Sequence, residues 1–138
     1  MNKYSLFISV LLITNSIFGQ TVTRDSLFNF DWRFHKGTIN DAEKKEFKDG
    51  DWRLVDLPHD WSIEDLNITD TTSKRIISGP FDSKAIAGKN SGFTVGGTGW
   101  YRKHFNLPQK DTAKVVYIMF DGVYMNADVW INGYHLGN

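Results

Sequence analysis

Aromatic and polar side chains alternate strictly over residues 28–35, and this pattern restricts the fold class more than any other stretch of the chain. The aromatic positions are Phe28, Phe30, Trp32 and Phe34, and the polar positions are Asn29, Asp31, Arg33 and His35. Successive side chains of a β-strand point to opposite faces, so a period of two predicts a strand with one buried face. The chain is therefore expected to build its core from sheets.

Four further segments have the pattern of extended structure. Residues 52–57 end at Pro58, residues 100–107 alternate up to Pro108, residues 114–120 are apolar on both faces, and residues 127–131 lead into Asn132-Gly133. A segment that is apolar on both faces predicts a central strand, and Asn-Gly is the strongest short signal for a hairpin. Residues 41–47 favour at most a short helical turn, and residues 62–99 have no period, as in a long functional loop. The pattern predicts an all-β antiparallel sandwich.

These strands also predict the core and the state of the sheet at the end of the chain. After Asn132-Gly133 a return strand begins at Tyr134 and the sequence stops at Asn138, which predicts a sheet that is incomplete at its C-terminal end. We expect a truncated product or a fragment of a longer chain, with a complete short protein as the alternative. The expected core residues are Phe28, Phe30, Trp32, Phe34, Trp100 or Tyr101, Val116, Ile118, Phe120, Val129 and Ile131.

The N-terminus has the three parts of an export signal. Lys3 supplies a positive charge, residues 4–13 are mostly apolar, and Gly19 offers a small residue for cleavage. The apolar run is shorter than the roughly 20 residues that a membrane span requires. The sequence therefore predicts a signal peptide over residues 1–19, a mature domain over residues 20–138, and a periplasmic or secreted protein. A buried N-terminal strand or helix is the alternative.

Composition and spacing exclude several classes of function. The 16 basic residues balance the 16 acidic ones, so no strong field favours nucleic acid or an anionic membrane as a partner. Without cysteine there is no disulfide framework or thiolate site, and the 4 histidines lack metal-ligand spacing. The glycines of residues 96–99 precede a strand rather than a helix, so they do not form a phosphate loop. We expect no metal and no cofactor.

Glycosidic hydrolysis requires two carboxyl groups that face each other across one bond. The glutamates of the chain are Glu43, Glu46 and Glu64, and no pair of carboxyl groups with a reason for a raised pKa is evident in their surroundings. We therefore assign no catalytic residue in this chain.

The residues Leu57-Pro58-His59-Asp60-Trp61 form the most suggestive cluster. Pro58 stops a predicted strand and places His59 and Asp60 at an edge or loop. A carboxylate beside an indole ring suits a sugar, because the oxygens accept hydroxyl hydrogen bonds while the ring covers C–H patches. The alternative is a structural corner in which Asp60 caps backbone N–H groups and Trp61 fills the core.

Four motifs occur in order along the chain, and they are Phe30-x-Trp32-x-Phe34, residues 52–61, residues 99–105 and residues 120–133. Together they resemble the N-terminal sugar-binding domain of glycoside hydrolase family 2, in its β-galactosidase branch. The match spans about residues 28–138, nearly all of the mature chain.

The resemblance implies a jelly-roll β-sandwich of the galactose-binding-domain-like kind, followed in longer members by an immunoglobulin-like domain and a catalytic barrel. It implies a carbohydrate substrate, contact with those further domains, and Asp60 as the best candidate for a sugar contact, with His59 next. We expect part of an exported β-galactosidase-like glycosidase that is inactive without its barrel. The alternatives are a stand-alone carbohydrate-binding module and the same domain of a β-glucuronidase or β-mannosidase.

Overall fold

The computed structural model describes residues 26–66 and 75–138, so the export signal predicted for residues 1–19 lies outside the described part. The described residues form short antiparallel strands and 3₁₀ turns, with no α-helix among them, which confirms the all-β prediction. None of these turns is long and apolar enough to cross a membrane. The strands are β1 (Trp32–Lys36), β2 (Arg53–Val55), β3 (Ile77–Ser78), β4 (Phe81–Asp82), β5 (Gly99–Arg102), β6 (Val129–Ile131) and β7 (Tyr134–Gly137), and the 3₁₀ turns are η1 (Trp61–Ile63), η2 (Gly88–Ser91) and η3 (Gln109–Asp111).

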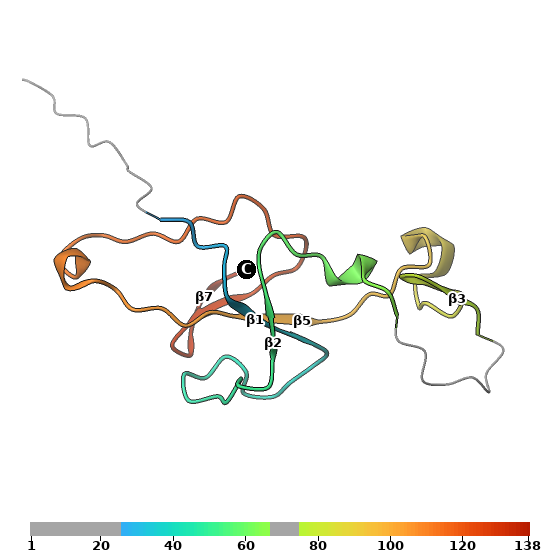
Figure 1. The fold of residues 1–138 in the computed structure, drawn as a ribbon, viewed down its shortest axis with the longest axis horizontal. Coiled ribbons are helices and arrows are strands. Elements are labelled where there is room, and N and C mark those ends of the chain that lie inside the picture. Colours follow the sequence, from blue (N-terminus) through green and yellow to red (C-terminus); the bar gives the residue numbers. More distant parts are fainter. Residues whose placement is uncertain (1–25, 67–74) are drawn as a thin grey trace, which may run out of the picture.

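A three-stranded sheet in the order β2-β1-β5 forms the centre of the molecule (Figure 1). Phe34 of β1 pairs with Arg53 on one side and with Tyr101 on the other, which places these three side chains on the same face. The predicted strands are therefore present but shorter than their sequence patterns. β1 begins only at Trp32, because Asp31 has a left-handed backbone with a φ of 58° and cannot continue a ladder.

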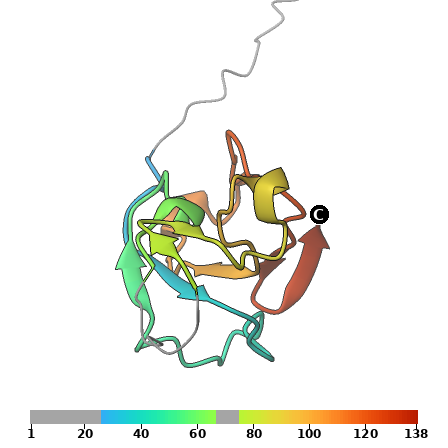
Figure 2. The same ribbon diagram turned by 90° about the vertical axis from the view of Figure 1, so that its right-hand side faces the viewer.

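The C-terminal hairpin forms as predicted. β6 and β7 pair antiparallel around Asn132-Gly133, whose φ angles of 50° and 84° are those that a tight two-residue hairpin turn requires. Trp130 of β6 stacks on Trp100 of β5 with ring centroids 5.6 Å apart. This contact packs the hairpin against the central sheet. In Figure 2, β2 and β7 lie on opposite sides of the molecule.

The prediction of a central strand over residues 114–120 is wrong. Residues 115–120 form neither a strand nor a turn. Their side chains lie on the surface, with Val115 and Tyr117 each 77% exposed. An apolar pattern indicates a tendency to be buried, whereas a strand also requires a neighbour that pairs with its backbone N–H and C=O groups. No described strand takes that place beside this segment.

The hydrophobic core is smaller than predicted. Trp32 and Phe34 are buried as expected, and the core also includes Ala42 and Trp52, which we did not predict. The half-buried members of the predicted set are Phe28, Trp100, Tyr101, Val129 and Ile131. The members that are exposed, contrary to prediction, are Phe30, Val116, Ile118 and Phe120. Phe30 lies before the left-handed residue that delays the start of β1, and the other three lie in the unpaired segment over residues 114–120.

Asp49 fastens the loop before β2 to the sheet. Its side chain is 9% exposed and accepts hydrogen bonds from Arg102 Nε at 2.8 Å and His104 Nε2 at 2.7 Å. Burial of Asp49 opposes ionisation, but the hydrogen bonds from these two side chains prevail and lower its pKa. Arg33 donates to the backbone carbonyl of Asp49 at 3.2 Å. The loop thus covers the face of the sheet that carries these basic residues.

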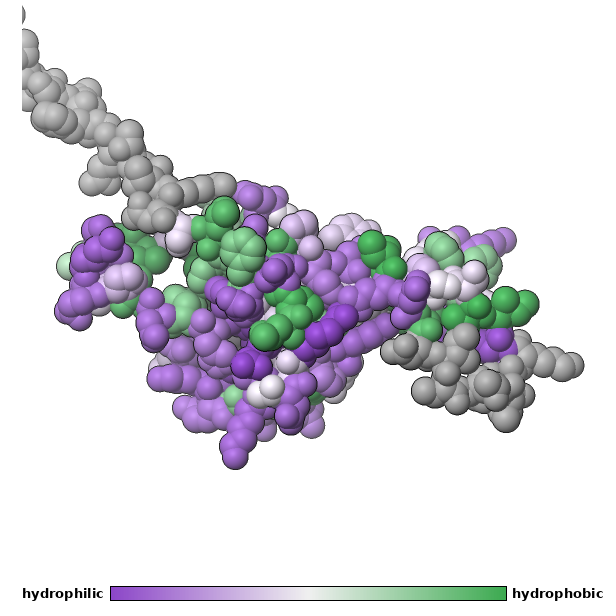
Figure 3. Space-filling view, viewed as in Figure 1, coloured by the Kyte–Doolittle hydropathy of each residue, from purple (hydrophilic) through white to green (hydrophobic). Residues whose placement is uncertain are grey.

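A small hairpin interrupts the stretch that we interpreted as an aperiodic loop. β3 and β4 pair antiparallel, and η2 follows at the end of the molecule that faces the viewer in Figure 2. Asp82 is 1% exposed and accepts two hydrogen bonds of 2.8 Å from Arg75 Nε. Apolar side chains gather on the surface of this end of the molecule (Figure 3), and they include Ile76, Phe81 and Ile86. An ion pair between a buried carboxylate and a partly exposed guanidinium therefore takes the place of a hydrophobic core here.

We expect this hairpin to loosen in acid. The hydrogen bonds from Arg75, opposed by burial and aided by the Lys84 N–H, lower the pKa of Asp82 to about 2, whereas aspartate in an unfolded chain has a pKa of about 3.9. Because the folded pKa is the lower one, the stabilisation is complete above about pH 5 and is lost as the pH falls through about 4 towards 2. The protection factor of the Ser83 amide, which donates to Ile76 O at 2.9 Å, should fall over that range. In the Asp82→Asn variant it should not change with pH, and an unchanged wild-type value would contradict the prediction.

Candidate functional site

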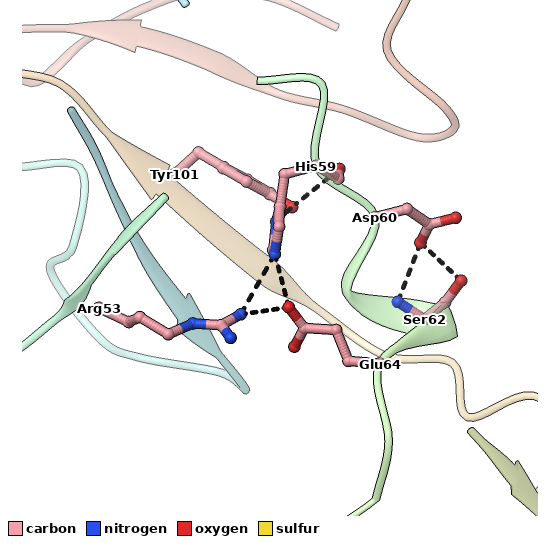
Figure 4. A network of polar contacts seen from close by, with 6 residues as sticks. All are labelled: Arg53, His59, Asp60, Ser62, Glu64 and Tyr101. Carbon is pink, nitrogen blue, oxygen red and sulfur yellow. Dashed lines mark hydrogen bonds and ion pairs between the residues drawn. The ribbon is translucent and has the colours of Figure 1, made fainter. Parts of the chain in front are cut away.

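His59 and Asp60 lie in the turn that joins β2 to η1, next to the buried face of the central sheet (Figure 4). Asp60 is the N-cap of η1, with extended backbone angles of φ −129° and ψ 99°. Its Oδ1 accepts hydrogen bonds from the Ser62 backbone N–H at 2.9 Å and the Ser62 hydroxyl at 2.6 Å. These bonds, first from the hydroxyl and then from the N–H, lower the pKa of Asp60. Asp60 is therefore an exposed, ionised carboxylate whose Oδ1 is held in place.

His59 is held at both ring nitrogens. Its Nδ1 lies 2.7 Å from the Tyr101 hydroxyl, and its Nε2 lies 2.7 Å from Glu64 Oε1. The imidazole packs edge-on against the Phe34 ring, with centroids 4.9 Å apart. Only 13% of the His59 side chain is exposed. The two strands β1 and β5 and the segment after η1 thus meet at this one ring.

Glu64 is the shared acceptor of this cluster. Arg53 Nη2 donates to Glu64 Oε1 at 2.6 Å and lies 3.2 Å from His59 Nε2, since both nitrogens approach the same oxygen. Partial burial of Glu64 opposes ionisation, but the hydrogen bonds from Arg53 and His59 prevail and lower its pKa. At neutral pH this carboxylate is ionised, so it accepts hydrogen bonds and has no proton to give as a general acid.

Tyr101 of β5 is the member of the cluster that contacts the Nδ1 side of His59. Burial, together with the negative charges of Asp60 and Glu64, raises the pKa of the Tyr101 phenol to about 12. The hydroxyl therefore keeps its proton at neutral pH and is a hydrogen-bond donor. It lies 2.7 Å from His59 Nδ1 and 3.4 Å from the His59 carbonyl oxygen. The chemistry of the cluster is thus that of a rigid support rather than of a proton donor to substrate.

Trp61 follows Asp60, and its indole ring lies against the start of β5. It is half-buried, and the Lys36 ammonium lies 4.6 Å from its ring centroid. A Cβ atom at Gly99 would lie 2.5 Å from Trp61 Nε1. Gly99 therefore leaves room for the indole ring of Trp61. It does not serve as part of an anion-binding loop.

Replacing Gly99 with alanine is expected to displace Trp61 and to lower the free energy of unfolding by about 1–3 kcal/mol, because the added methyl group overpacks the site. The new atom would also lie 3.2 Å from Phe34 Cε2. Chemical denaturation monitored by tryptophan fluorescence measures the change. Gly96→Ala is the matched control, since a Cβ there meets nothing within 4 Å. Equal stability of the two variants would show that Trp61 moves aside without cost.

Sequence reasoning found two members of the cluster and missed three. It singled out His59 and Asp60, but it found no partner for Glu64, named Tyr101 only as a core candidate, and gave no individual role to Arg53. Nothing in the sequence singles out Arg53, Glu64 and Tyr101. They meet because of the register of β1 with β2 and β5 and because the chain returns after η1. Among the residues in the described ranges, no group of three or more histidine and carboxylate side chains could hold a metal ion.

The chain is similar to a small part of larger known proteins. No protein-family model matches it. It is 46% identical over 110 residues to a β-galactosidase of Bacteroides ovatus and 38% identical over 110 residues to a β-glucuronidase of Formosa agariphila. Each match covers 80% of this chain, but only 11% and 10%, respectively, of the two relatives. The chain thus spans about a tenth of the length of these curated relatives.

Solved structures agree with the sequence matches. A glycosyl hydrolase family 2 member from Bacteroides cellulosilyticus superposes with a TM-score of 0.65 at 46% identity, and a β-glycosidase from Bacteroides vulgatus superposes with a TM-score of 0.62 at 38% identity. Each superposition covers 80% of this chain and 13% of the larger one. Similarity of sequence and of fold thus coincide over the same share of the chain. The chain therefore belongs to glycoside hydrolase family 2, in which it corresponds to one all-β domain of much larger proteins.

Proposed function

We propose that this chain is the N-terminal sugar-binding and support domain of an exported β-galactosidase-like enzyme that hydrolyses terminal β-glycosides. The observation that carries the proposal is the Asp60 carboxylate, which is ionised, exposed and held on one side only. Among the hydrogen bonds of the described residues, Ser62 uses Oδ1 and none engages Oδ2. An anchored carboxylate with an open oxygen can accept a hydroxyl hydrogen bond from a terminal sugar.

His59, the second candidate, is suited to a supporting part in this function. Both of its ring nitrogens are already in contact with Tyr101 and Glu64, and little of its surface is open. We propose that Asp60 contacts the sugar directly and that His59 stands behind it. A jelly-roll fold and contact with an immunoglobulin-like domain and a barrel belong to the same proposal.

The name of one relative favours a second candidate substrate. The Formosa agariphila protein is a β-glucuronidase, and a glucuronide carries a carboxylate that a galactoside lacks. A negatively charged Asp60 disfavours direct contact with such a group, because like charges repel. We therefore prefer a neutral sugar at Asp60, with a glucuronide as the alternative to be tested.

The test is hydrolysis of chromogenic β-galactoside, β-glucuronide and β-mannoside by the full-length protein that carries this chain. We expect the β-galactoside to be cleaved fastest. Residues 1–138 alone should cleave none of them, since a retaining site requires two carboxyl groups about 5 Å apart, one of them protonated. Of the glutamates here, Glu64 is held ionised and Glu46 is exposed. Cleavage by residues 1–138 that is abolished by one Glu→Gln change would contradict the proposal.

Export is tested separately. We propose that residues 1–19 are removed, so the mass of the protein recovered from the periplasm or medium should correspond to an N-terminus at Gln20. An intact Met1 on cytoplasmic protein would contradict this part of the proposal and leave the sugar-binding part unaffected.

A further inference from the structure

Asp60 and His59 are neighbours in the chain, but they are held in different ways. Within the described part of the chain, the Asp60 side chain is hydrogen-bonded only to Ser62, two residues further along the same turn. The His59 ring is bonded to Tyr101, 42 residues away on β5, and to Glu64, beyond η1. Figure 4 shows the imidazole between these two partners, with the Asp60 carboxylate on the other side of the turn. The turn is thus fastened to the sheet through His59.

Tyr101, His59 and Glu64 form a hydrogen-bonded relay, and its proton positions follow from the chemistry of its two ends. An ionised Glu64 can only accept, so His59 Nε2 must carry a proton and donate it. In a neutral imidazole the other nitrogen, Nδ1, is then an acceptor. The Tyr101 hydroxyl, which remains protonated at neutral pH, donates to it. A flip of the His59 ring would place carbon atoms where its two nitrogens now lie and would break both contacts.

We propose that Tyr101, His59 and Glu64 are positioning residues that set the direction of the Asp60 carboxylate toward the sugar. The inference rests on the proposed function, in which Asp60 binds the substrate. Arg53 holds Glu64 from the far side at 2.6 Å, which keeps the acceptor in place. The Tyr101 and His59 rings also pack against Phe34, each with centroids 4.9 Å from its ring, so the relay stands on the buried face of β1.

Two conservative changes weaken the relay at its two ends and leave its packing intact. Tyr101→Phe deletes the hydroxyl but keeps the ring against Phe34. Glu64→Gln keeps the size of the side chain but removes the charge that His59 and Arg53 contact. In the full-length protein each change should lower kcat/KM by about three- to tenfold, the effect of losing one hydrogen bond or the charge that strengthens one. The matched controls are Tyr134→Phe, whose ring is 74% exposed on β7, and Glu46→Gln in an exposed turn, and neither should change kcat/KM.

A double-mutant cycle separates positioning from general stability. If Tyr101 acts through Asp60, then Tyr101→Phe should lower kcat/KM by less than about twofold once Asp60→Asn is present, because the charge that it orients is gone. A fold-change equal to that in the wild-type background would show that Tyr101 acts independently of Asp60, and it would overturn the inference. The same comparison with Glu64→Gln repeats the test from the other end of the relay.

Hydrogen exchange tests the inference without relying on activity. The Ser62 N–H donates to Asp60, so its protection reports how firmly the turn is held. Exchange of the peptide over residues 58–66 in the full-length protein should be about tenfold faster in Tyr101→Phe and Glu64→Gln than in the two controls. Unchanged exchange would overturn the inference. If the full-length protein cleaves no glycoside, the proposed function fails, while the exchange rates still decide whether the relay positions the turn.

Discussion

Replacing Trp32 with alanine is expected to lower the free energy of unfolding by about 3–5 kcal/mol, the usual effect of truncating a buried tryptophan. Trp32 is 9% exposed, its ring meets Phe28 edge-on at 5.7 Å, and its Nε1 donates to the Phe28 carbonyl at 2.7 Å. The change therefore leaves a cavity under β1 and an unpaired carbonyl oxygen. A loss of this size is a large part of the total stability of a small domain.

Urea denaturation followed by circular dichroism measures this effect. Phe30→Ala is the matched control, because Phe30 belongs to the same aromatic alternation but is 53% exposed. Its change should stay within about 0.5 kcal/mol, as for most surface substitutions. Equal losses in the free energy of unfolding for Trp32→Ala and Phe30→Ala would contradict the prediction, because they would show that Phe30 contributes to the core as much as Trp32 does.

Replacing Asp60 with asparagine is expected to lower kcat/KM of the full-length protein by about ten- to a hundredfold. Asparagine is as good an N-cap as aspartate, so the hydrogen bonds with Ser62 and the start of η1 should persist. What the change removes is the negative charge that strengthens a hydrogen bond from a sugar hydroxyl. The loss of a charge-assisted hydrogen bond is about 1.5–3 kcal/mol, which corresponds to the stated range.

The measurement compares kcat/KM and the melting temperature of the wild type and Asp60→Asn. Asp56→Asn is the matched control, since Asp56 is also an exposed carboxylate, but it accepts from the Asp31 N–H at 3.0 Å. That variant should retain its kcat/KM. If Asp60→Asn kept full activity but melted at a lower temperature, the carboxylate would be a cap of η1 and nothing more, as the structural interpretation of this turn holds.

The sequence by itself determined those features that depend on near neighbours. Alternation around Trp32 and Phe34 indicated a strand with one buried face, and both side chains are buried in β1. Asn132-Gly133 indicated a hairpin, because its left-handed backbone angles are a property of these two residues alone. Pro58 indicated that His59 and Asp60 lie in a turn, because a proline has no backbone N–H to continue a strand ladder. Backbone preferences and side-chain period act over a few residues, so a sequence displays them directly.

Only the tertiary structure decided which side chains meet and which stay uncovered. The contact of His59 with Tyr101 joins residues 42 positions apart, and it depends on the register that places Tyr101 opposite Phe34. The apolar residues 114–120 show the converse, since no described strand pairs with them and their pattern alone could not supply one. Pairing and burial depend on what lies across a gap in space, and a one-residue shift of register would turn every side chain to the other face. For this reason the cluster behind Asp60 could be found only in the fold.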